Sequence, residues 1–99
     1  MPAARVELSE QARAQIREID AWWRENRQRS PDLFGQEVDK ALKTLADTAT
    51  PGVLYDGRKA VRRLLLERSH YHRYFTRQTD VQYVVAVWSA FRGRGPRLL

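Results

Sequence analysis

The spacing of apolar residues changes after the first nine residues, and the change predicts two different elements. Residues 4–9 alternate apolar and polar side chains, which is the period of a short half-buried strand. Residues 10–27 instead repeat apolar side chains every three or four positions, as one face of a helix does; the repeat consists of Ala12, Ile16, Ile19 and Trp23. Ser9 stands before this repeat as a candidate N-cap. The pattern therefore predicts a strand followed directly by a helix.

A second helical repeat follows the polar segment 25–32. Ser30 and Pro31 within that segment predict a cap followed by proline at the first helical position. The apolar stripe then continues to about residue 48 through Phe34, Val38, Ala41, Leu42 and Leu45. Thr50, Pro51 and Gly52 are a strong stop signal. We therefore expect two helices joined by a short polar connection, which is a helical hairpin.

Three further strands are predicted after residue 60. They cover residues 61–67, 70–77 and 81–88, and the turn signal Asp56-Gly57 precedes the first of them. The last strand is apolar on both faces, so we expect it at the centre of the sheet. The predicted fold class is α+β: an N-terminal strand, a helical hairpin and a three-stranded antiparallel meander (β-α-α-β-β-β), with the helices packed on one face of the sheet. Residues 1–99 are expected to form a single domain.

Composition excludes several classes of protein. The chain is 42% hydrophobic and 30% charged and contains no cysteine, which favours a folded domain and excludes disulfides and thiolate metal sites. It shows no signal-like segment and no membrane-length apolar run, so we expect a cytoplasmic protein that does not bind a membrane. His70 and His72 are expected on one strand face without a carboxylate partner, and no nucleotide-binding glycine pattern occurs. We therefore predict no metal and no cofactor.

Charge is distributed unevenly between the two halves of the chain. Residues 1–57 contain eight basic and ten acidic residues, whereas residues 58–99 contain ten basic and two acidic ones. The net charges of these segments are thus −2 and +8, and the whole chain carries +6. A field of this sign attracts nucleic acid, an acidic protein segment or anionic lipid, and charge alone does not choose among these partners.

Arginines in the C-terminal half form the clearest candidate binding site. Because antiparallel strands bring alternate side chains together, a patch is predicted on the face opposite the helices, made of Arg62, Arg63, Arg73, Arg77 and Arg92. Such a patch could bind phosphates or carboxylates. The alternative is an ordinary solvated sheet face, on which arginine stems cover apolar surface. Trp22 lies beside the apolar stripe of the first helix and is expected to be partly exposed, as a contact for a partner.

In the order and spacing of these features, the chain resembles the toxins of bacterial type II toxin–antitoxin modules, the RelE/ParE superfamily. The resemblance spans nearly the whole chain, from the strand that ends in Ser9 through the helical hairpin and the Pro51-Gly52 break to the last strand and Arg92. It implies a small basic toxin of a plasmid-stabilisation type, neutralised by a cognate antitoxin whose acidic groups suit the basic half. Operator DNA would be bound only through the antitoxin.

The superfamily has two functional branches, and the resemblance is nearer to the ParE-like branch. RelE-like members cleave mRNA on the ribosome, whereas ParE-like members inhibit DNA gyrase. The catalytic residues of an RNase would here be His72, Arg62, Arg63 and Arg92, but no tyrosine follows Trp88, so the RNase pattern is incomplete. We therefore predict a gyrase inhibitor that is not an enzyme, with a ribosome-dependent endoribonuclease as the alternative. A third possibility is a degenerate toxin kept only as an autoregulation partner.

The resemblance and the charge pattern together give a set of predicted contact residues. The antitoxin is expected to bind Arg62, Arg63, Arg73 and Arg77. The target is expected to contact Trp22, Arg58, Lys59, Arg92 and Arg94.

Overall fold

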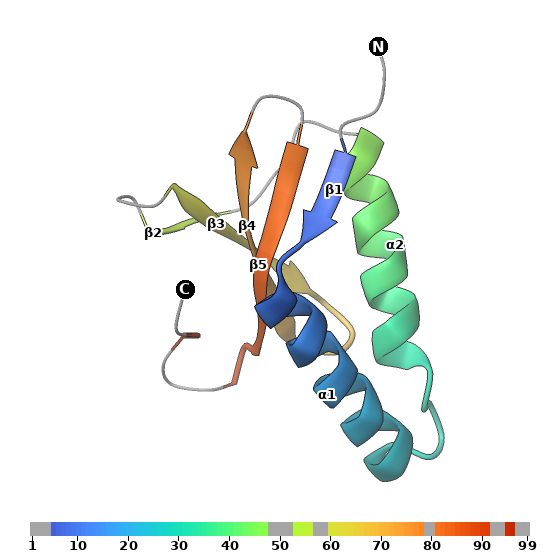
Figure 1. Ribbon diagram of the computed structural model, residues 1–99. Helices are drawn as coiled ribbons and strands as arrows, with labels where there is room; N and C mark the ends of the chain where they lie inside the picture. Colours follow the sequence, from blue (N-terminus) through green and yellow to red (C-terminus); the bar gives the residue numbers. More distant parts are fainter. Residues whose placement is uncertain (1–4, 48–52, 57–59, 79–80, 92–94, 97–99) are drawn as a thin grey trace.

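The computed structural model describes residues 5–47, 53–56, 60–78, 81–91 and 95–96 (Figure 1). In chain order the elements are β1 (Arg5–Leu8), α1 (Glu10–Asn26), α2 (Leu33–Asp47), β2 (Val53–Asp56), β3 (Val61–Leu66), β4 (Tyr71–Gln78) and β5 (Val81–Ser89). The predicted α+β class and its strand, helical hairpin and meander are confirmed. The structure adds one strand, β2, where the sequence had predicted only a turn leading into β3.

All strands belong to one sheet with the order β1-β5-β4-β3-β2. The strand β1 pairs parallel with β5, and the other pairs are antiparallel. The expected central position of the last strand is wrong by one place: β5 is interior, between β1 and β4, but β4 is the middle strand. The reason is β2, because this extra edge strand shifts the centre of the sheet toward β4.

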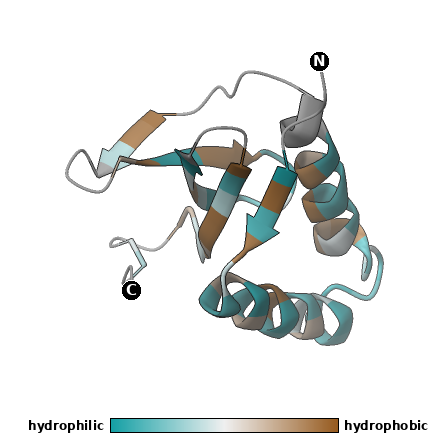
Figure 2. Ribbon diagram, turned by 45° about the horizontal axis from the view of Figure 1, so that its top comes forward, coloured by the Kyte–Doolittle hydropathy of each residue, from teal (hydrophilic) through white to brown (hydrophobic). Residues whose placement is uncertain are grey.

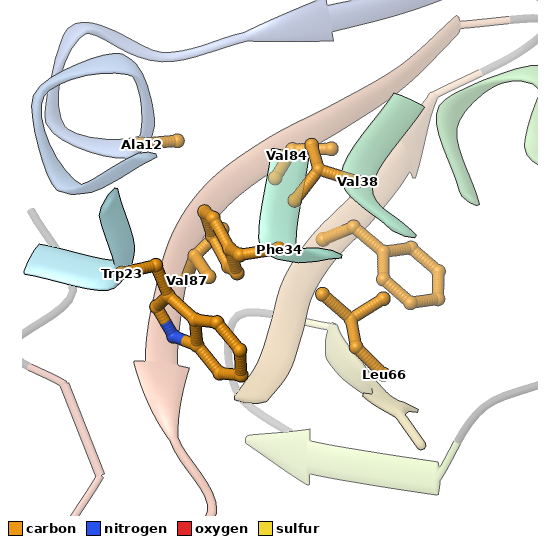
Figure 3. Packing of buried hydrophobic residues seen from close by; sticks show 8 residues of the cluster. Ala12, Trp23, Phe34, Val38, Leu66, Val84 and Val87 are labelled. Atoms are coloured by element: carbon orange, nitrogen blue, oxygen red, sulfur yellow. The ribbon is translucent and has the colours of Figure 1, made fainter. Parts of the chain in front are cut away.

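Both helices cover the same face of the sheet and share a core with it (Figures 1 and 3). Trp23 comes from α1, Phe34 and Val38 come from α2, and all three are buried against residues of β3, β4 and β5. The Phe34 ring is fully buried and lies 5.1 Å from the ring of Tyr71 in an edge-on arrangement. Each helix carries both hydrophobic and hydrophilic residues (Figure 2), as is expected of a helix that buries one side against a sheet.

The first helix begins as predicted, and the second begins later. Ser9 has extended backbone angles (φ −67°, ψ 162°), and its Oγ accepts a hydrogen bond from the N–H of Ala12 at 3.0 Å. The same hydroxyl donates to the carbonyl of Val85 at 3.1 Å, which connects the cap to β5. The prediction that Pro31 is the first helical residue is wrong, because Pro31 lies in the preceding turn and α2 begins at Leu33.

Glu37 of α2 fixes this helix to the turn between β3 and β4. Its carboxylate accepts hydrogen bonds from the backbone N–H groups of Arg68 at 2.8 Å and Ser69 at 2.9 Å, and also from the hydroxyl of Ser69. Burial raises the pKa of Glu37, but these hydrogen bonds and the charge of Arg68 outweigh that effect and hold the pKa below its ordinary value. The ionised carboxylate therefore stabilises the contact between helix and turn.

Replacing Glu37 with glutamine is expected to lower the free energy of unfolding at pH 7 by about 1–2 kcal/mol, because an amide offers one acceptor oxygen where the carboxylate offers two. Since the folded pKa is lowered, the carboxylate's contribution is complete above its unfolded value of 4.5 and is lost as pH falls through the folded pKa. Urea denaturation of the wild type and of Glu37→Gln at pH 7 and at about pH 3 measures the difference in unfolding free energy at each pH. A difference between them that stays the same at both pH values would contradict the assignment.

Candidate partner-binding surfaces

Strand register places the two adjacent arginines of β3 on opposite faces of the sheet. Arg63 lies opposite Tyr74, which belongs to a small core cluster on the face away from the helices. Arg62 lies opposite Phe75, which belongs to the core under the helices, so Arg62 projects from that face and is exposed there. The predicted single patch of arginines is therefore wrong, because successive side chains of a strand alternate between faces.

Arg73 also departs from the predicted patch. It lies opposite Leu64 of β3 and Val87 of β5 on the helix-covered face, and only 3% of its surface is exposed. Arg77 follows four positions later on the same strand and is exposed. Of the predicted antitoxin contacts, Arg62, Arg63 and Arg77 are therefore surface residues, whereas Arg73 lies in the core.

On the face away from the helices, aromatic and basic side chains form a group that we call the open-face cluster: Tyr55, Arg63, His72 and Tyr74. The guanidinium of Arg63 lies 5.6 Å from the ring centre of Tyr55, and the rings of Tyr55 and Tyr74 meet edge-on at 4.7 Å. The ring of His72 lies 6.1 Å from that of Tyr74. The strands β2, β3 and β4 thus each supply part of one surface on which a cation and aromatic rings are combined.

The environment of the open-face cluster shifts the pKa values of two of its members. Burial lowers the pKa of His72, and the charge of Arg63 lowers it further, so the imidazole is neutral at pH 7. Burial raises the pKa of Tyr74, while a hydrogen bond from Arg63 acts in the opposite direction. The phenol stays protonated at neutral pH. The cluster therefore offers one fixed cation, Arg63, among neutral groups that donate and accept hydrogen bonds.

Near its end the chain returns to this cluster. Pro96 is buried, and a Cβ atom placed on Gly95 would lie 2.8 Å from Cζ of Tyr55. A side chain at position 95 would therefore push the Tyr55 ring aside. Glycine permits the close approach of the chain to that ring.

A groove of about 540 Å³ lies between the C-terminal half of α1 and the adjoining ends of β4 and β5, with Trp22, Trp23, Tyr71 and Phe91 in its lining. Trp22 is 44% exposed, and Phe91 is 79% exposed. The guanidinium of Arg27 lies 4.9 Å from the ring centre of Trp22 and 5.8 Å from that of Trp23. The expected partial exposure of Trp22 is confirmed, and its side chain belongs to a concave aromatic surface of the kind that partners bind.

The predicted RNase residues are only partly brought together. His72 and Arg63 belong to the open-face cluster, whereas Arg62 projects from the other face. Of the predicted contacts, Arg58, Lys59, Arg92 and Arg94 lie outside the described residues.

The two histidines do not share a strand face, contrary to expectation. His70 precedes β4, has a φ of 62° and places its ring 5.0 Å from that of Phe91, whereas His72 lies within β4. Within the residues that the structure describes, no group of three or more metal-binding side chains is found. No helix in the same residues is long and apolar enough to cross a bilayer.

Two residues with clear roles in the structure were not singled out in the sequence: Tyr55 of the open-face cluster and Glu37, which connects α2 to the turn between β3 and β4. No strand was predicted at Tyr55, because the turn signal Asp56-Gly57 follows it, although Val53, Leu54 and Tyr55 are a short run of strand-forming residues. No contact was predicted for Glu37, because its role depends on a turn that lies 31 residues further along the chain. The neighbouring residues thus gave a signal for the strand that contains Tyr55, but they gave none for the contact of Glu37.

A helical hairpin on one face of a mostly antiparallel sheet with a parallel N-terminal strand defines the class of fold. Among solved structures, the chain is similar to one described as "Chromosomal ParDE TA system from P. aeruginosa", with a TM-score of 0.73 and 16% sequence identity over 88% of this chain and 96% of that chain. No protein-family model matches the sequence, and no curated protein matches it. The structural likeness confirms the fold that the resemblance to the RelE/ParE superfamily implied.

Proposed function

We propose that this protein is the toxin of a type II toxin–antitoxin module and that a cognate antitoxin neutralises it. The observation that carries the proposal is the fold, which is shared with a chain of a ParDE toxin–antitoxin system over nearly the full length of both. The basic C-terminal half gives this fold a charge that suits an acidic partner segment. In this role the protein acts in the cytoplasm and contacts operator DNA only through the antitoxin.

We propose DNA gyrase as the target, as in the ParE-like branch. Two observations support this choice over the ribosome. The candidate RNase residues His72 and Arg62 project from opposite faces of the sheet, so they cannot surround one phosphate group. The aromatic groove with Trp22 offers instead a surface suited to protein contacts. In this proposal the groove contributes to target binding, and no bond is broken by the toxin itself.

For the antitoxin, we propose the open-face cluster and the exposed arginines of the same sheet as contacts. Arg63 is partly fixed by Tyr55 and Tyr74, so less conformational freedom is lost when a partner carboxylate binds it. Arg62 and Arg77 are exposed on the other face. An antitoxin that contacts all three therefore has to pass around the edge of the sheet, as an extended chain segment can.

The gyrase proposal is tested with the purified chain in a supercoiling assay. At micromolar concentration the protein is expected to inhibit supercoiling of relaxed plasmid by gyrase, and prior addition of the antitoxin should restore it. A heat-denatured sample serves as the control. Supercoiling that proceeds unchanged at this concentration would rule out gyrase as the target.

One observation favours the endoribonuclease as a second candidate. His72 is neutral at pH 7 and lies beside Arg63, so it can accept a proton near a cation that binds phosphate. This candidate predicts cuts at fixed codon positions in translated mRNA, which disappear in His72→Ala. Absence of such cuts during growth arrest would exclude it.

A further inference from the structure

Arg73 is a buried cation for which the described residues provide no hydrogen-bond partner. Its side-chain atoms Nε, Nη1 and Nη2 are all buried, and none of them donates to an acceptor. The guanidinium lies 5.1 Å from the ring centre of Phe75. An aromatic ring attracts a cation but does not replace the oxygen acceptors that five N–H donors require. The core therefore contains donors whose hydrogen bonds are unmade.

The charge of Arg73 persists despite its burial. Burial lowers the pKa of Arg73 to about 10, and no carboxylate among the described residues acts against that shift. At pH 7 the guanidinium is still protonated. A buried charge without a counter-ion is unfavourable, whereas a charge with a well-placed carboxylate forms two parallel hydrogen bonds.

No counter-ion fits beside Arg73 while the helices keep this position. The adjoining cavity has a volume of about 10 Å³, which is the space of about one water molecule. Apolar residues make up the rest of its lining, including Ile16 of α1 and Val38, Ala41 and Leu42 of α2. A carboxylate can therefore reach the guanidinium only if one of the helices moves.

The C-terminal half of α2 is the part best suited to move. Burial decreases along this helix: Phe34 is 0% exposed and Val38 is 7% exposed, but Ala41 and Leu42 are only partly buried. Glu37 ties the N-terminal half of α2 to the turn between β3 and β4. The N-terminal half can thus stay in place while the segment that covers Arg73 is displaced.

We propose that Arg73 binds a carboxylate of a partner protein, carried by an otherwise apolar segment that takes the place of the C-terminal half of α2. The apolar lining favours such a segment over nucleic acid, which would bring a phosphate charge with every nucleotide against aliphatic side chains. Under the proposed function this partner is the antitoxin. That identification rests on the proposed function, whereas the Arg73 site does not.

The first test is the stability of the free protein. Arg73→Met removes the buried charge and keeps an apolar side chain of similar length, so its melting temperature is expected to rise by roughly 5 °C. Arg5→Met, which changes an exposed strand arginine, is the matched control and should melt like the wild type. A lower melting temperature for Arg73→Met would mean that the guanidinium is already satisfied, and it would overturn the proposal.

The second test uses random dodecapeptides displayed on phage and selected for binding to the full wild-type chain. We expect peptides with one Asp or Glu between apolar residues, whose affinity falls roughly 100-fold for Arg73→Met and stays unchanged for Arg5→Met. Selection that yields no Arg73-dependent peptide, or acidic peptides that bind Arg73→Met equally well, would overturn the proposal. Neither the melting temperature nor the peptide affinity depends on growth arrest or gyrase. Failure of the Arg73 proposal can therefore be distinguished from failure of the proposed function.

Discussion

Replacing Phe34 with alanine is expected to lower the free energy of unfolding by about 3–5 kcal/mol, the largest stability effect that we predict for one residue. Phe34 is 0% solvent-exposed, and its ring packs edge-on against the ring of Tyr71 from the sheet. Removing it leaves a cavity between α2 and the sheet that the surrounding side chains cannot fill completely. For a domain of this size, such a loss is a large fraction of total stability.

Phe91→Ala is the matched control for this prediction. It removes the same side chain from a position that is 79% exposed, so the change in unfolding free energy should stay within about 0.5 kcal/mol. Urea denaturation of the three proteins, monitored by far-UV circular dichroism, gives both values. Equal losses at positions 34 and 91 would contradict the core described for this fold.

Arg63→Glu is expected to weaken the complex with the antitoxin by at least roughly 100-fold, the largest binding effect of an exposed-face substitution. The reason is that Arg63 is the cation of the open-face cluster, between Tyr55 and Tyr74. A glutamate there removes the partner of an antitoxin carboxylate and adds a like charge. Isothermal titration calorimetry with the purified antitoxin measures the loss.

A control with the same change of charge distinguishes loss of a direct contact with the antitoxin from the effect of a lower net charge. Arg13→Glu alters an exposed arginine of α1, away from the sheet face, and should reduce the affinity only slightly. If Arg63→Glu and Arg13→Glu weakened binding equally, the antitoxin would be responding to net charge. If Arg63→Glu bound as tightly as the wild type, the open-face cluster would not be part of the antitoxin interface.

Local signals were enough to predict most of the fold. The alternation before Ser9, the cap that Ser9 forms and the apolar stripe with Phe34 and Val38 all follow from the spacing of residues along one segment. The strand β2 was missed because it is only four residues long and ends at a turn signal. Short edge strands have few residues in which a period can be recognised.

The candidate site could be predicted only in part, because it depends on which face each strand residue takes. Adjacent strand residues such as Arg62 and Arg63 point to opposite faces of the sheet. Only the pairing of Arg62 with Phe75 shows which of the two is on the helix-covered face. Arg73 was expected at the surface as part of the predicted arginine patch, and arginine is in general seldom buried without a partner. Its burial follows from register and from helix position, and neither is written in the residues next to it.

The measurement that tests the toxin proposal most directly is to express the chain without its antitoxin and to follow protein synthesis and DNA-damage induction in the same cells during the first minutes. If the protein is a gyrase-directed toxin, growth stops, DNA damage appears early and translation continues, and antitoxin co-expression prevents all of it. An immediate stop of translation with mRNA cut inside reading frames would contradict the gyrase assignment, and normal growth would contradict the toxin assignment itself.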